Sequence, residues 1–255
     1  MKFYRFLEKD LARKNIDFSE FYDSANAVEK RILEEYGALF VARGGAIVPA
    51  QIIFKSESEV SAFQKSVSIT KENIGGFELE LQTAAMNDLL KSIADAEKND
   101  LTITPRAADS ARRNYAQTVE LWASRVVPAL EHWTKEGKLN ETDAAGILAL
   151  APFEQVPVIF KLEEKGIFFS KDLSKSIVYS VAPPGTSQHL SMLAFDVAEY
   201  KNERVRKILA LNGWFQTVVS DLPHFTYLGA DEKEFPNLGL KKVENCGQAF
   251  WIPNI

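Results

Sequence analysis

Hydrophobic positions near the N-terminus follow first a helical and then a strand-like pattern. Residues 24–36 place apolar side chains three or four positions apart and end before Gly37, which predicts a helix closed by a glycine. Two short apolar runs within residues 39–48 flank an Arg-Gly-Gly sequence, which predicts a hairpin. Ser56, followed three residues later by Glu59, predicts the start of a further short helix.

The middle of the chain is dominated by helical patterns. Residues 77–82 are predicted as an amphipathic helix, and residues 83–98 as a longer helix with one apolar stripe. A short strand is then predicted over residues 101–105. A second long helix is predicted from residue 109 or 110 to about residue 125, and Pro128 is expected to bend or end it.

The C-terminal third indicates short strands arranged around one helix. Residues 194–197 alternate like a buried strand, and residues 203–212 carry a helical apolar stripe that Gly213 closes. Residues 215–220 and 225–228 predict two more strands. Strands and helices mixed in this way predict an α+β fold, with a central antiparallel sheet and flanking helices.

Composition narrows the functional classes. The 255 residues are 46% hydrophobic and carry a net charge of −5, so the chain can bury a sizeable core. The acidic balance argues against binding nucleic acid or an anionic membrane by electrostatics. No apolar run of transmembrane length and no signal peptide is found, and Cys246 is the single cysteine, which excludes an intrachain disulfide. The oligomeric state stays open.

The candidate chemistry lies in two short sequences that hold two of the three histidines. His189 is followed after six residues by Asp196, and Asp221 precedes His224 by three positions. A catalytic zinc ion takes three ligands from histidine nitrogens and carboxylate oxygens, and it leaves a fourth position to water. His189, Asp196 and His224 could fill those positions, and Asp221 could accept the proton of the water. His132 has no such partners and is expected to serve packing or the surface.

These sequences resemble the D-alanyl-D-alanine carboxypeptidase and dipeptidase family of zinc peptidases, which includes vancomycin-resistance enzymes. The shared pattern is Ser187-x-His189, six residues and Asp196, followed by an acid three residues before a second histidine, His224. The resemblance covers roughly residues 77–255 and implies a zinc D,D-peptidase-like domain. Residues 1–76 are then an N-terminal α/β extension in which we find no candidate chemistry.

The resemblance implies a role for each residue of the motif. His189, Asp196 and His224 would bind Zn²⁺, Asp221 would act as general base, and Arg106 would stabilise the oxyanion. The substrate would be a peptidoglycan peptide, and the protein would act in the periplasm or elsewhere outside the cytoplasm. No role in binding nucleic acid is implied.

Three positions depart from the family pattern. Asp221 stands where the family usually has glutamate, Met192 where it commonly has glycine, and Pro105 where it often has an aromatic residue. Arg112 and Arg113, further along, are predicted to lie on a solvated helix face. Two functions therefore follow as hypotheses: a zinc-dependent D,D-peptidase, or a zinc-stabilised module that binds cell-wall peptides or a protein partner without turnover.

Overall fold

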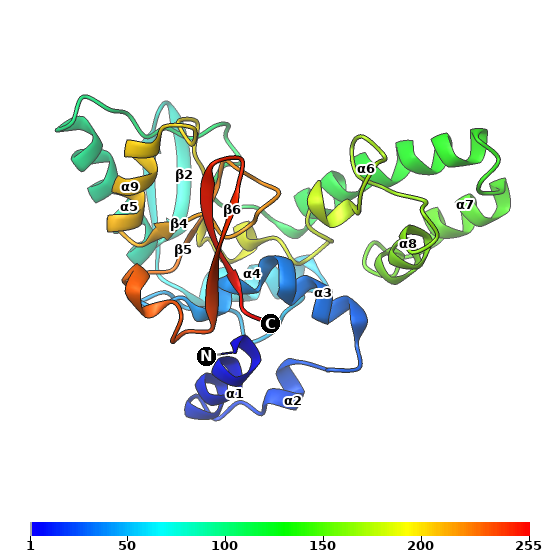
Figure 1. Ribbon diagram of the computed structural model, residues 1–255, viewed down its shortest axis with the longest axis horizontal. Helices are drawn as coiled ribbons and strands as arrows, with labels where there is room; N and C mark the ends of the chain where they lie inside the picture. The colour runs from blue at the N-terminus through cyan, green and yellow to red at the C-terminus, as the bar shows by residue number, and fades with distance from the viewer. Residues whose placement is uncertain (1) are drawn as a thin grey trace. The chain divides into compact units, whose positions relative to one another are not determined.

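The structure is a computed structural model that describes residues 2–255 (Figure 1). It combines helices with three small antiparallel sheets, which confirms the predicted α+β class. The chain forms two compact units. Unit 1 takes in the chain up to Ile52, Ser61–Arg113 and Gln188–Ile255, and unit 2 comprises Ile53–Val60 and Asn114–Ser187. No helix within residues 2–255 has the length and apolar character needed to cross a membrane.

Short helices form the N-terminal part of the chain. They are α1 (Phe3–Arg13), α2 (Phe18–Phe21), α3 (Ala27–Tyr36), the 3₁₀ helix η1 (Gly37–Val41) and α4 (Glu57–Ser66). The Asn26 side chain caps α3 by accepting from two backbone N–H groups. The hairpin predicted over residues 39–48 is wrong. Every residue of η1 is buried, whereas a hairpin with one solvent-facing side would have left alternate residues exposed.

A hairpin forms instead further along the chain, where β1 (Ile69–Ile74) pairs with β2 (Phe77–Gln82). The helix predicted over residues 77–82 is therefore wrong. Leu79 and Leu81 are buried, whereas the alternate residues Glu78 and Glu80 are exposed or partly covered, and this period of two belongs to a strand. The predicted domain boundary at residue 76 falls inside the turn of this hairpin and does not separate compact units.

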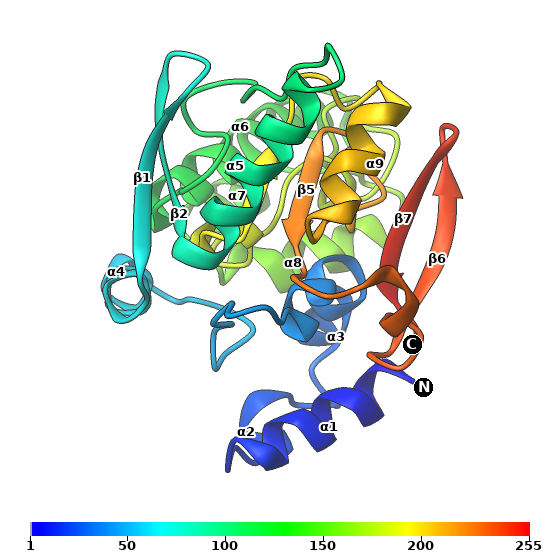
Figure 2. The same ribbon diagram turned by 90° about the vertical axis from the view of Figure 1, so that its left-hand side faces the viewer.

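The core of unit 1 lies between a three-stranded sheet and two helices. The sheet has the order β3-β5-β4, and its strands are β3 (Ala194–Asp196), β5 (His224–Tyr227) and β4 (Trp214–Phe215). Helices α5 (Thr83–Glu97) and α9 (Glu203–Leu211) run side by side next to β5 (Figure 2). Phe225 and Tyr227 belong to this core, so the alternate residues His224 and Thr226 face the other side of β5.

The predicted strands of unit 1 are shorter than expected. Residues 101–105 form no strand and make only a single bridge, between Pro105 and Val197. The predicted strand over residues 215–220 ends at Phe215. The remaining elements of unit 1 are η3 (Gln188–Ser191), η4 (Glu232–Glu234) and the C-terminal hairpin of β6 (Leu240–Asn245) and β7 (Gln248–Pro253).

Unit 2 is mainly helical. Its helices are α6 (Tyr115–Lys135), α7 (Glu141–Ala149), α8 (Gln155–Glu163) and the 3₁₀ helix η2 (Ile177–Tyr179). Helix α6 begins at Tyr115 and not near residue 109, because Asn114 and Gln117 form a capping box there. Pro128 lies inside α6 and does not end it.

Candidate metal centre

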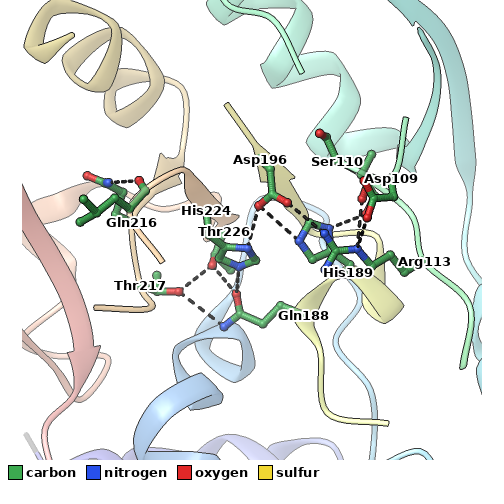
Figure 3. Close-up of polar contacts among 12 residues, drawn as sticks. Asp109, Ser110, Arg113, Gln188, His189, Asp196, Gln216, Thr217, His224 and Thr226 are labelled. Carbon is green, nitrogen blue, oxygen red and sulfur yellow. Dashed lines mark hydrogen bonds and ion pairs between the residues drawn. The ribbon is translucent and has the colours of Figure 1, made fainter. Parts of the chain in front are cut away.

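Three of the predicted site residues come together on the side of the sheet away from the helices. His189 lies on η3, Asp196 ends β3, and His224 begins β5 directly opposite Asp196 in the register (Figure 3). One nitrogen or oxygen atom from each residue lies within 4.8 Å of the others. His189 is 2% exposed and His224 is 5% exposed, so the group is buried. The predicted convergence of these three side chains is confirmed as a cluster able to hold a metal ion.

A backbone carbonyl fixes the protonation of His189. Nδ1 lies 2.6 Å from the carbonyl oxygen of Ala111, which only accepts hydrogen bonds, so Nδ1 carries the proton. Nε2 then offers its lone pair, and it lies 3.4 Å from Oδ1 of Asp196. A histidine that ligates a metal generally donates its other ring N–H in this way.

His224 has the complementary arrangement. Its Nε2 lies 2.8 Å from Oε1 of Gln188, and its Nδ1 lies 3.2 Å from the same Oδ1 of Asp196. With the proton on Nε2, two imidazole lone pairs point at one carboxylate oxygen, and no proton lies between them. A cation at this point satisfies all three atoms, and the donor set of two nitrogens and one carboxylate oxygen suits zinc.

Electrostatics favour neutral imidazole and ionised carboxylate. Burial lowers the pKa of His189, although Asp196 acts in the opposite direction. Burial by itself raises the pKa of Asp196, but the two histidines outweigh this effect and hold that pKa well below its usual range. Metal ligands must be deprotonated, and the pKa shifts of His189 and Asp196 both act in that direction.

Arg113 completes the surroundings of Asp196. Its guanidinium donates to Oδ2 of Asp196 at 3.0 Å, and its side chain is 15% exposed. The same side chain donates to the carbonyl oxygen of Asp109 at 3.1 Å. The prediction that Arg113 lies on a solvated helix face is wrong, because α6 starts only at Tyr115. The capping sequence Asn114-x-x-Gln117 was the signal that could have placed Arg113 before the helix.

Arg106 contacts the centre with its backbone and not with its side chain. Its backbone N–H donates to the carbonyl oxygen of Asp196 at 3.2 Å. The side chain is exposed, and within residues 2–255 it makes no hydrogen bond or ion pair with the centre. The catalytic role that the resemblance implies for Arg106 stays a prediction, and Arg113 is the arginine whose guanidinium reaches Asp196.

Asp221 lies on the connection between β4 and β5, three residues before His224. Its carbonyl oxygen accepts from the backbone N–H of His224 at 3.1 Å, which closes a turn and holds Asp221 beside the ligand. The residue is exposed at its surface, yet protein atoms around the carboxylate desolvate it and raise its pKa; His224 lowers that pKa, and Asp196 raises it. The charges of the centre therefore shift the pKa of this carboxylate, although within residues 2–255 no hydrogen bond joins it to His189, Asp196 or His224.

The backbone of Asp196 is held from a separate segment. Its N–H donates to the carbonyl oxygen of Ser110 at 2.9 Å, and its carbonyl accepts from Arg106. Glu199 fastens the preceding residues of that segment, because its carboxylate accepts from Thr104 N at 2.8 Å, from Thr104 Oγ1 at 2.6 Å and from Thr102 Oγ1 at 3.3 Å. Both the N–H and the carbonyl group of Asp196 are thus held by hydrogen bonds to residues 106–110.

The chain turns sharply between the first two ligands. Met192 has φ = 56°, in the left-handed region that glycine adopts most readily. Its backbone N–H donates to the carbonyl oxygen of His189 at 3.1 Å, and its side chain is fully buried. Methionine is thus accommodated here in a backbone conformation that glycine adopts more readily.

Comparison with known proteins leaves the family open. No family model, no curated protein and no solved structure matches the chain. The resemblance to the zinc D,D-peptidases therefore depends on the residues of the motif alone, and it stays a prediction.

Proposed function

We propose that this protein is a zinc-dependent D,D-peptidase that hydrolyses the amide bonds of cell-wall peptides. The proposal joins two independent supports: the sequence motif of the resembling family, and a buried cluster of the same residues in the structure. The family resemblance also supports a zinc D,D-peptidase-like fold for unit 1 and a location outside the cytoplasm.

One observation carries the proposal. The lone pairs of His189 Nε2 and His224 Nδ1 lie 3.4 and 3.2 Å from Asp196 Oδ1, and each ring has its other nitrogen bonded to an oxygen acceptor. Three acceptors that face one another without a proton repel each other unless a cation lies between them. A metal ion fills the point where these three atoms meet with both imidazoles neutral.

The residues divide the chemistry between them. Zinc bound here would supply a Lewis acid that acidifies water and polarises the scissile carbonyl. Asp221 receives the proton of the attacking water and passes it to the leaving amine, because its raised pKa brings proton affinity closer to neutral pH. Arg113 donates to Oδ2 of Asp196 and so keeps that carboxylate ionised and oriented.

A zinc-stabilised binding module is the second candidate. It is favoured by the shorter acid at position 221, because no hydrogen bond of the Asp221 carboxylate to a ligand is found within residues 2–255. In that case the same centre would organise the loop around His189, and the neighbouring surface would recognise a peptide or a protein partner. Metal content would be the same for both candidates, and turnover separates them.

The decisive experiment combines metal analysis with a digestion panel. The purified protein is expected to hold about one zinc per chain, and to release D-alanine or another cell-wall fragment from peptides ending in D-Ala-D-Ala. A chelator should stop the release and added zinc should restore it. The His224→Ala variant should lose both zinc and turnover, whereas the control variant His132→Ala should keep both. Zinc without turnover across the panel would favour the binding module, and absence of zinc would reject both candidates.

A further inference from the structure

Gln188 is a buried glutamine next to a ligand, and it takes part in a fully satisfied polar network. The residue is 2% exposed and directly precedes His189. Its Oε1 accepts from His224 Nε2 at 2.8 Å and from the hydroxyl of Thr226. Its Nε2 donates to the carbonyl oxygen of Tyr36 at 2.8 Å and lies 3.4 Å from Oγ1 of Thr217 (Figure 3 shows these contacts apart from that to Tyr36).

The carbonyl of Tyr36 decides which end of the Gln188 amide faces His224. A carbonyl oxygen only accepts, so the amide must turn its NH₂ group toward Tyr36 and its oxygen toward His224. An amide oxygen also only accepts, so His224 must place its proton on Nε2. The lone pair of Nδ1 is then left for Asp196 and the cation. This chain of hydrogen bonds sets the tautomer of a ligand from a residue 188 positions away from it in sequence (224 − 36).

We propose that Gln188 is a positioning residue that locks His224 in the metal-binding tautomer, and that the N-terminal segment ending at Tyr36 sets the orientation of the lock. The proposal rests on the metal-binding part of the proposed function and adds a residue and a segment to it. Residues 1–76, in which the sequence shows no chemistry, thereby contribute the carbonyl that orients the lock. Tyr36 ends α3 and is itself buried, so its carbonyl is held rigidly.

The energetic consequence follows from removing the acceptor. Without Oε1, the proton of His224 has no partner in a buried site, and the Nδ1–H tautomer becomes competitive because Nδ1 can donate to Asp196. A metal must then displace that proton before it binds. Loss of such an outer hydrogen bond typically lowers metal affinity by about 10–100-fold.

The test compares two buried glutamines in the intact protein. Gln188→Leu is expected to lower zinc affinity by about 10–100-fold, measured by competition with a chromophoric chelator. Gln82→Leu is the matched control, because Gln82 is also 2% exposed and its amide bonds only to backbone atoms of Ile47 and Ser191. The control should lose stability to a similar degree and keep its zinc affinity. The absorption spectrum of bound Co²⁺ should change for Gln188→Leu alone, because only there does the ligand geometry relax.

A conservative variant and a spectroscopic probe keep the result decisive. Gln188→Glu retains an oxygen acceptor for His224 but sets its second oxygen against the carbonyl of Tyr36, so it is expected to recover only part of the affinity lost in Gln188→Leu. The ¹⁵N signals of the ring nitrogens report the tautomer directly, and with three histidines in the chain their assignment is short. His224 protonated on Nε2 in the wild type and in Gln188→Glu supports the lock, even if Gln188→Leu does not fold.

The failures of the two proposals differ. A wild-type protein that binds no zinc overturns the metal centre and the lock together. A wild-type protein that binds zinc, with Gln188→Leu equal to it in affinity and in Co²⁺ spectrum, overturns the positioning role alone. Protonation of His224 on Nδ1 in the zinc-bound wild type likewise overturns the lock and leaves the metal centre standing.

Discussion

Two regions next to His224 each contribute an aspartate, and the surroundings shift the pKa values of these two aspartates in opposite directions. At the end of β3, Asp196 Oδ1 lies 3.4 and 3.2 Å from the two histidines, Oδ2 accepts a hydrogen bond from Arg113, and the pKa of Asp196 is held well below the usual range. On the connection before β5, Asp221 is exposed, and its pKa is raised because nearby protein atoms remove part of the water around the carboxylate.

The contrast assigns different chemistry to the same side chain. A carboxylate with its oxygens fully engaged and its charge stabilised is suited to hold a cation. A carboxylate that is desolvated and unengaged is suited to take up and release a proton. Pairs of acids whose surroundings drive their pKa values apart are a general sign of divided catalytic roles. The difference between these regions therefore supports a ligand at Asp196 and a base at Asp221.

The largest expected effects come from replacing each carboxylate with an amide, which tests whether Asp196 and Asp221 have different roles. Asp196→Asn should abolish zinc binding, because the anionic oxygen between the two histidines is lost. Asp221→Asn should keep about one zinc per chain, while kcat falls by about 10²–10⁴-fold, the usual contribution of a general base. Zinc content by elemental analysis and initial rates of D-alanine release measure the two effects.

The opposite pattern would remove the division of roles. Zinc lost from Asp221→Asn would make Asp221 a ligand, and unchanged turnover in that variant would exclude it as the base. Asp221→Glu serves as a second check, since it restores the acid that the resembling family usually has and is expected to keep zinc and turnover.

The two arginines offer a smaller effect that sharpens the picture around Asp196. Arg113→Ala should lower kcat by about 10–100-fold, the usual effect of removing a hydrogen bond that orients a metal ligand. Arg106→Ala should change kcat by less, because its contact with Asp196 is made by the backbone, which alanine retains. Parallel kcat measurements on zinc-loaded variants decide between them. A larger loss for Arg106→Ala would return the catalytic role to the residue that the family resemblance indicates.

The smallest expected effect concerns the backbone that carries Asp196. Glu199→Gln keeps the shape of the side chain but weakens the hydrogen bonds to Thr102 and Thr104. We expect a loss of about 1 kcal/mol in the free energy of unfolding, since hydrogen bonds to an ionised group are only partly replaced by a neutral amide. Urea denaturation measures it. A stability equal to the wild type would show that the segment from Thr102 to Arg106 is held by other contacts.

The cluster of candidate ligands was predictable from the sequence, because histidines are rare in this chain and two of them have aspartates at a short spacing. With three histidines in the chain, two that each lie near an aspartate stand out, and the loop and strand patterns around them place them at neighbouring strand ends. The outer partners were not accessible. Gln188 and Ala111 act through a side-chain amide and a backbone carbonyl, which have no sequence signature, and Arg113 was hidden by a helix start predicted too early.

Secondary structure was predictable where the spacing of hydrophobic residues clearly matched either a helix or a strand. Helices α5 and α9 begin and end close to the predicted positions, because each has a regular apolar stripe. The alternation in residues 77–82 is too short to separate a helix from a strand by hydrophobicity, and its pairing with β1 decided the outcome. The buried run at η1 has no polar face at all, so its conformation depended on contacts distant in sequence.

The turn at Met192 has a consequence for how ready the centre is before any ion arrives. A side chain in the left-handed region costs on the order of 1 kcal/mol relative to glycine, and burial of the thioether offsets that cost. The packing of the Met192 side chain in the core therefore restricts the backbone between His189 and Asp196, whereas glycine would leave this segment more conformational freedom. Zinc would meet ligands already set at their final separation, and little ordering entropy would oppose its capture.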